Sequence, residues 1–150
     1  PLSTLITPNL PEARLLAEQN IESVDDMLEA ARALQQRGAS AVLVKGGHMP
    51  GNTLSDVLLL ADGSEHVFTD ARIDTRNTHG TGCTLSAAIA AHLALGADML
   101  RAVQRGRDYV RNALTAGAKA CIGHGHGPVN HGFDPQPMHT RPLSGVAAHE

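Results

Sequence analysis

The sequence predicts an α/β layered domain around a core sheet that contains parallel strands. Apolar runs typical of strands alternate with segments whose apolar positions repeat at the helical period, in the order strand, helix, helix, strand, hairpin, helix, helix. The run at 41–44 is apolar at every position, as in a strand buried on both faces of a parallel sheet. Of the 150 residues 42% are hydrophobic, so the chain can form a packed core as one domain or a large piece of one.

The first half of the chain begins with a strand and two helices. Residues 5–7 are typical of the end of a buried strand, which Pro8 stops. Because a complete domain rarely begins inside a core strand, we expect an N-terminal part of the fold to be absent. A first helix is predicted over residues 11–19, with Pro11 in its first turn. A second helix ends near Gly38, and its apolar stripe consists of Val24, Leu28, Ala31 and Leu34.

The second half continues with the strand at 41–44 and then a hairpin. Two strand-like runs, at 53–60 and 65–69, flank an Asp-Gly pair, which is a strong hairpin signal. A helix rich in small residues is predicted over residues 84–95, and a longer helix over residues 99–120. Together with the first half, these elements give the layered order stated above.

The composition excludes several classes of partner. The formal net charge of −3 provides no electrostatic basis for binding nucleic acid or an anionic membrane. No apolar run approaches the ~20 residues of a spanning helix, and no basic stretch precedes an apolar one at the start, so we expect neither a membrane span nor a signal peptide. Cys83 and Cys121 are too few for a disulfide framework, which fits a reducing, cytoplasmic location.

The strongest local motif is Asn-Thr-His-Gly-Thr-Gly-Cys-Thr at 77–84, directly before the small-residue helix. Its glycines allow a close backbone approach to a ligand, and the amide groups of the helix start can bind an anion. Cys83 is expected at this helix start, where the helix dipole favours a thiolate. Cys121, near the end of the next helix, is expected to be buried. The alternative is a tight turn before a helix with a small buried thiol, and the motif by itself leaves both readings open.

Two further motifs follow strand ends. The first places Asn9 and Glu12 three residues apart, with oxygen atoms that suit Mg²⁺ held through water beside phosphates. Capping of the following helix is the alternative for this pair. The second is Lys-Gly-Gly-His at 45–48, where Lys45 can neutralise phosphate charge and Gly46 leaves room for a nucleotide. Its alternative is a strand-to-loop turn with a solvated lysine.

The segment beyond residue 123 is rich in Gly, His and Pro. Its histidines suggest zinc, but the spacings of structural zinc sites are absent, so a noncatalytic metal-binding module is only an alternative. Residues 136–150 show little periodicity and are predicted to form a flexible tail. Three aspartates have no spacing that distinguishes them from surface charges, namely Asp70, Asp74 and Asp134.

Taken together and in this order, the motifs resemble those of ribokinase-like kinases. Residues 9–12 are similar to the Asn-x-x-Glu element of these kinases. The loop at 77–84 is similar to the anion-hole loop of their vitamin-kinase branch, which has cysteine where sugar kinases usually have aspartate. With Val-Lys-Gly-Gly-His at 44–48 and Gly-His-Gly-Pro-Val-Asn-His at 125–131, the chain resembles the hydroxymethylpyrimidine/phosphomethylpyrimidine kinases of thiamin biosynthesis over residues 5–133. The resemblance implies a ribokinase-like three-layer α/β/α fold with a mostly parallel central sheet.

This resemblance also implies an activity and a set of site residues. The reaction would be ATP-dependent phosphorylation of 4-amino-5-hydroxymethyl-2-methylpyrimidine and then of its monophosphate, with ATP and Mg²⁺ as cofactors. Glu12 would organise the metal. The catalytic residues would be Gly80, Thr81, Gly82 and Cys83, and those that bind ATP would be Asn9, Lys45, Gly46 and Thr78.

The same resemblance leaves the substrate side open. Residues 1–135 would be the C-terminal portion of the kinase domain, carrying the ATP-binding half, whereas most substrate contacts would lie in the part expected to be absent. A homodimer or a separate chain could supply that part. Pyridoxal kinase-type activity of the same branch and an inactive fragment are the nearest alternatives.

Overall fold

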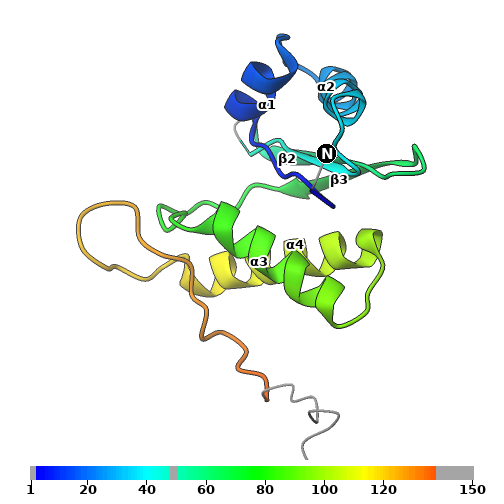
Figure 1. The fold of residues 1–150 in the computed structure, drawn as a ribbon. Helices are drawn as coiled ribbons and strands as arrows, with labels where there is room; N and C mark the ends of the chain where they lie inside the picture. Colours follow the sequence, from blue (N-terminus) through cyan, green and yellow to red (C-terminus); the bar gives the residue numbers. More distant parts are fainter. Residues whose placement is uncertain (1–2, 48–50, 138–150) are drawn as a thin grey trace, which may run out of the picture.

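The computed structural model describes residues 3–47 and 51–137, and these form three layers (Figure 1). A three-stranded sheet lies in the middle. Helices α1 (Leu10–Ala17) and α2 (Val24–Gln36) cover one face, and α3 (Thr81–Ala94) and α4 (Met99–Gly117) cover the other. The α/β/α layering expected from the sequence is therefore present. The tail predicted at 136–150 lies almost entirely outside the described residues.

The sheet has the strand order β1-β2-β3. Strand β1 spans Val42–Lys45, β2 spans Thr53–Leu59 and β3 spans Glu65–Ala71. Both neighbouring pairs are antiparallel, and β2 and β3 form the hairpin that the sequence predicts. These three strands do not show the mostly parallel pairing that the sequence predicts. The connection between β1 and β2 is too short for the helical crossover that parallel neighbours need.

Parallel pairing is confined to the first residues of the chain. Ile6 and Asn9 form parallel bridges with Val42 and Lys45, respectively, so the segment before α1 runs alongside β1. This segment is connected to β1 through α1 and α2, which is the helical crossover that parallel pairing needs. The predicted strand at residues 5–7 is thus present as a bridge rather than as a full strand.

Both helices on the upper face begin with a complete capping box. In α1 the Asn9 side chain accepts from the Glu12 backbone N–H, and Glu12 in return accepts from the Asn9 N–H. Ser23 and Asp26 form the same reciprocal pair in α2. Each box satisfies amide donors that a helix start would otherwise leave unpaired, which fixes where the two helices begin.

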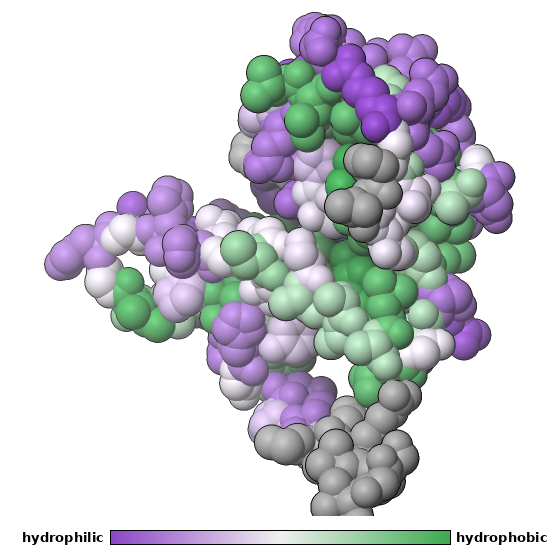
Figure 2. All heavy atoms as spheres, viewed as in Figure 1, coloured by the Kyte–Doolittle hydropathy of each residue, from purple (hydrophilic) through white to green (hydrophobic). Residues whose placement is uncertain are grey.

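The core has two parts, one on each side of the sheet. Alternation along β1 sends Val42 and Val44 toward α1 and α2, and Leu43 toward α3 and α4. The small residue Gly106 lets α4 approach α3, because a Cβ there would lie 2.8 Å from the Ile89 side chain. The outer side of α3 is also apolar, and a band of hydrophobic residues shows along it in the middle of Figure 2. Its exposed small residues are Ala87, Ala90, Ala91 and Ala94.

The end of α4 corrects two expectations. The helix ends at Gly117, before the residue 120 that the periodicity predicts, so the chain beyond it leaves the apolar stripe. Consequently Cys121 is exposed, although the sequence predicted a buried thiol. Among the described residues no helix is long and apolar enough to cross a membrane, and no group of three His, Cys, Asp or Glu side chains is arranged to hold a metal ion.

Candidate phosphate-binding site

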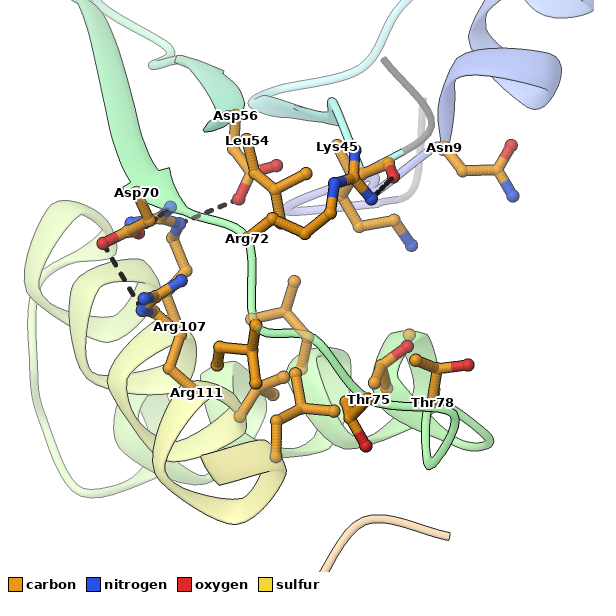
Figure 3. A pocket seen from close by; sticks show the side chains of 17 residues that line it. Asn9, Lys45, Leu54, Asp56, Asp70, Arg72, Thr75, Thr78, Arg107 and Arg111 are labelled. Carbon is orange, nitrogen blue, oxygen red and sulfur yellow. Dashed lines mark hydrogen bonds and ion pairs between the residues drawn. The ribbon is translucent and has the colours of Figure 1, made fainter. Parts of the chain in front are cut away.

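A cavity of about 560 Å³ lies between the lower face of the sheet, the start of α3 and one side of α4 (Figure 3). Strand ends, the loop before α3 and α4 all contribute to its wall. The residues that line the cavity are Asn9, Lys45, Gly47, Leu54, Asp56, Asp70, Arg72, Ile73, Thr75, Thr78, Thr81, Gly82, Leu85, Arg107, Val110, Arg111 and Leu114.

Lys45 and the start of α3 face each other across one end of the cavity. A Cβ atom built on Gly82 would lie 3.4 Å from the Lys45 Nζ atom, so the ammonium group lies close to the first turn of α3. Gly80 precedes the helix with a φ of 87°, a conformation that glycine adopts without strain, and no side chain caps the helix. The ammonium group and the positive end of the helix dipole therefore point at one place, where an anion would be stabilised by both.

The wall of the cavity carries more positive than negative charge. Among the described residues, Lys45 takes part in no ion pair, and Arg72 donates to the Gly47 and Gly51 carbonyl oxygens. The four basic side chains of the wall are Lys45, Arg72, Arg107 and Arg111, against the two carboxylates Asp56 and Asp70. An anionic ligand therefore fits this cavity better than a neutral or cationic one.

Arg107 is the centre of an ion-pair network on this wall. Its Nε donates to Asp56 at 2.9 Å and its Nη2 to Asp70 at 2.7 Å, while its guanidinium lies 4.6 Å from the centre of the Phe68 ring. Arg111 adds a longer contact of 3.4 Å to Asp70. The side chain of Arg107 is 11% exposed, so these contacts form away from bulk water, where they hold α4 firmly against β2 and β3.

The loop before α3 is fixed by one buried amide. Asn77 is 6% exposed, and its Nδ2 donates to the carbonyl oxygens of Gly117 at 2.7 Å and Ala120 at 2.8 Å. A Cβ on Gly127 would lie 2.0 Å from the Asn77 Oδ1, and the His79 N–H donates to the Gly127 carbonyl oxygen. Asn77 thereby joins three segments that are distant in the sequence and holds the loop at the end of the cavity.

The structure brings together five of the nine predicted site residues. They line the cavity and are Asn9, Lys45, Thr78, Thr81 and Gly82. Four others are not part of its lining, namely Glu12, Gly46, Gly80 and Cys83. Gly80 and Cys83 directly flank lining residues, and the Cys83 side chain is exposed.

Gly46 has a different role from the one its position suggested. A Cβ on this residue would lie 1.9 Å from the Ser55 carbonyl oxygen, so the space beside it is filled by the backbone of β2. Its missing side chain lets β1 and β2 pack, whereas the open space beside the cavity is at Gly47, where a Cβ would meet nothing within 4 Å.

The predicted metal residue Glu12 takes part in the capping box of α1. Its Oε2 accepts from the Asn9 N–H at 2.7 Å, and Asn9 Oδ1 accepts from the Glu12 N–H at 2.9 Å. Carboxylate and amide oxygens have further lone pairs, so the cap leaves them able to accept a bond from water. Asn9 reaches the cavity wall and Glu12 is exposed just behind it, an arrangement that fits a metal ion held through water.

Sequence reasoning missed the acidic and basic wall of the cavity. Asp70 was expected to be a surface charge, which is wrong, because it pairs with Arg107 and Arg111. A signal was available, since Arg107 and Arg111 are four residues apart on one helix face, and Asp56 and Asp70 occupy sheet positions that face the same side as Leu58. Only the fold, however, brings this helix face against that side of the hairpin.

The comparisons agree with the resemblance that the motifs indicate. Residues 1–130 match the family model described as phosphomethylpyrimidine kinase. The hydroxymethylpyrimidine/phosphomethylpyrimidine kinase of Rhizobium meliloti (strain 1021) is 47% identical over 133 residues, which cover 87% of this chain and 49% of that enzyme. The chain spans no more than about half the length of the first curated relatives it matches.

Solved structures of two kinases share the fold. Phosphomethylpyrimidine kinase from Clostridium difficile 630 has a TM-score of 0.61 and 36% identity, over 76% of this chain and 44% of that one. Pyridoxal kinase from Staphylococcus aureus, solved in complex with AMP-PCP and pyridoxal, has a TM-score of 0.78 and 30% identity, over 87% of this chain and 48% of that one. The ribokinase-like fold expected from the sequence is confirmed by these neighbours.

Proposed function

Since this chain belongs to the phosphomethylpyrimidine kinase family, we propose that its cavity binds ATP, with the phosphates between Lys45 and the start of α3. The observation that carries this proposal is the approach of the Lys45 ammonium group to Gly82, which leaves a cationic space at an uncapped helix start. The AMP-PCP complex of the related pyridoxal kinase supports a nucleotide as the occupant. The apolar part of the wall, which includes Val110 and Leu114, would contact the base and ribose.

The catalytic part of the proposal rests on the loop residues. Phosphoryl transfer has a loose transition state whose charge lies on the transferred group, so stabilisation of negative charge contributes most. The backbone N–H groups from Gly80 to Cys83 would supply it, and Lys45 would neutralise the phosphates of ATP. Exposed Cys83 would accept or orient the proton of the substrate hydroxyl.

Magnesium would be bound through water at the mouth of the cavity. Asn9 and Glu12 supply the oxygen atoms there, and their capping box fixes both side chains in place. The ion would neutralise phosphate charge. The contribution of the chain itself is to position this pair at the carboxyl end of the segment that runs parallel to β1.

For the whole enzyme we propose phosphorylation of 4-amino-5-hydroxymethyl-2-methylpyrimidine and its monophosphate. The Rhizobium relative is named hydroxymethylpyrimidine/phosphomethylpyrimidine kinase, and this chain is 47% identical to it in the matched region. This chain would contribute the ATP-binding half of the site. A second candidate is pyridoxal phosphorylation, which is favoured by the fold similarity to a pyridoxal kinase.

A chimera separates the two candidates. In the Rhizobium enzyme, the segment that aligns with this chain is replaced by this chain, so the relative supplies the remaining half. Product formation is measured by mass spectrometry with the pyrimidine alcohol and with pyridoxal. We expect pyrimidine phosphorylation within about tenfold of the parent enzyme. A folded chimera that binds no ATP would contradict the proposed function, and one that prefers pyridoxal would favour the second candidate.

A further inference from the structure

Lys45 and Asp56 are direct cross-strand neighbours. They are paired in the register of β1 and β2, so both side chains lie on the sheet face that α3 and α4 cover. Opposite charges at such a pair normally attract, because the Cβ atoms are only about 4.5–5.5 Å apart. Yet in the described part of the chain no ion pair joins these two residues, and the Lys45 ammonium group reaches Gly82 instead. Figure 3 shows the Lys45 side chain extending away from Asp56 toward the side of the cavity where Thr78 lies.

The carboxylate of Asp56 is occupied on both oxygens. Its Oδ1 accepts from the Gly46 N–H at 2.9 Å, and its Oδ2 accepts from Arg107 Nε at 2.9 Å. The first bond holds the backbone directly after Lys45. The second brings a positive charge from α4 to the place that the lysine would otherwise take.

Arg107 is well suited to outcompete Lys45 for this carboxylate. Its planar guanidinium bonds Asp56 and Asp70 at once and stacks on Phe68, so it is already ordered. A lysine has a single flexible ammonium group and would lose more conformational freedom in the same contact. With Arg107 in place, Asp56 therefore gains little from also binding the lysine.

We propose that Arg107 is a positioning residue that keeps Lys45 available for phosphate by occupying Asp56. This inference rests on the proposed function, in which Lys45 contacts the phosphates of ATP. Without Arg107, Asp56 retains its negative charge and has a cation one strand away, so Lys45 turns toward it. ATP then has to break that ion pair before it can bind.

Nucleotide affinity in three variants and the original chain tests this relation. The dissociation constant of MgATP is measured by calorimetry for the 150-residue chain. We expect Arg107→Gln to weaken binding about tenfold, the size of one lost charge-assisted contact. Adding Asp56→Asn to Arg107→Gln removes the competing charge and should restore affinity to within about threefold of the original. Arg105→Gln, which changes an exposed arginine of the same helix, is the matched control and should bind as the original chain does.

A second readout follows Lys45 without nucleotide. The chain contains only two lysines, Lys45 and Lys119, so labelled lysine gives two side-chain NMR signals, and Lys119 is an internal reference. The Lys45 signal should move in Arg107→Gln and return in the double variant, whereas the Lys119 signal stays. If Arg107→Gln does not fold, Arg107→Met, which keeps packing against Phe68, takes its place.

The two readouts separate the possible failures. If the original chain binds no MgATP, the proposed function fails, but the lysine spectra still decide whether Arg107 positions Lys45. Unchanged affinity and an unchanged Lys45 signal in Arg107→Gln would overturn the positioning role. A double variant that binds as weakly as Arg107→Gln, with Lys45 still shifted, would overturn it as well, since loss of packing rather than capture by Asp56 would then be the cause.

Discussion

Cys83 has its place at the third residue of α3, where its backbone and its side chain would serve different purposes. The backbone N–H belongs to the first turn of the helix, which provides positive potential toward the cavity. The side chain is exposed rather than buried in the helix interface. Exposure is what a proton acceptor for an incoming substrate needs, whereas a residue that merely fills space would be covered.

The first prediction concerns this thiol in the chimera with the Rhizobium enzyme. Cys83→Ala should lower kcat by about 10²–10⁴-fold, the usual contribution of a positioned acid or base, and should leave the KM for ATP little changed. Cys83→Asp should retain more activity than Cys83→Ala, because a carboxylate can still accept a proton. Steady-state kinetics at saturating MgATP give the result. Full activity of the alanine variant would assign Cys83 no part in proton transfer.

Asp26 provides a pH-dependent test of the capping box of α2. Its pKa is lowered below the ordinary 3.8, first by the bond that it accepts from the Glu22 N–H and then by its bonds with Ser23. A folded-state pKa below the unfolded one means that the ionised carboxylate stabilises the fold above pH 3.8, and that this contribution is lost as the pH falls through the folded value.

We therefore expect Asp26→Asn to lower the melting temperature at neutral pH, and the difference from the original chain to shrink below about pH 4. Asp25→Asn is the matched control. Asp25 lies in the same first turn, but among the described residues its carboxylate accepts no hydrogen bond. Thermal melts at several pH values measure both variants. Equal losses at neutral and acidic pH would show that the box adds nothing through charge.

The loop before α3 depends on Asn77, and the stability of a variant at this residue tests that dependence. Asn77→Ala leaves the Ala120 carbonyl oxygen without its donor and the Gly117 carbonyl oxygen with only the Ala120 N–H, so we expect a loss of about 1–3 kcal/mol in the free energy of unfolding. Because the loop carries the start of α3, MgATP affinity should also fall. Asn112→Ala, an exposed asparagine on α4, should change neither. A normal melting temperature for Asn77→Ala would mean that other contacts hold this loop.

Every helix and strand could be predicted from the sequence, with ends within a few residues. Local chemistry explains this success, since Asn9 begins α1 and the Asp-Gly turn joins β2 and β3. Strand direction was predicted less well, because the short run of β1 reads alike in parallel and antiparallel sheets. The charged wall of the cavity could not be predicted from the sequence either. Arg107 and Asp56 are 51 residues apart, and only the fold brings their two faces together.

In the whole molecule, the cavity lies between layers, so its two walls come from different parts of the chain. Lys45 belongs to the sheet, whereas Gly82 and Arg107 belong to the lower helices. The chain spans only about half the length of the Rhizobium kinase, and we propose that most substrate contacts lie in the part of the enzyme that it does not match. Nucleotide binding and turnover can therefore be separated experimentally.

We expect the 150-residue chain by itself to bind MgATP but to form little or no phosphorylated pyrimidine. ADP release with the pyrimidine alcohol is compared for this chain, the complete Rhizobium kinase and the segment of that kinase that aligns with this chain. The two matching segments should behave alike. Turnover by this chain at a rate close to that of the complete kinase would show that its own residues also bind the substrate.

In the proposed site, the phosphates of ATP lie between Lys45 and the start of α3. The most direct measurement is the MgATP dissociation constant of Lys45→Met against that of Lys119→Met, which changes the other lysine of the chain. Loss of one charge-assisted contact predicts that Lys45→Met binds about 10–100-fold more weakly, while Lys119→Met binds like the original chain. Adenosine, which has no phosphates, should bind both variants with the same dissociation constant. Equal MgATP affinities for the two variants would contradict the proposed site.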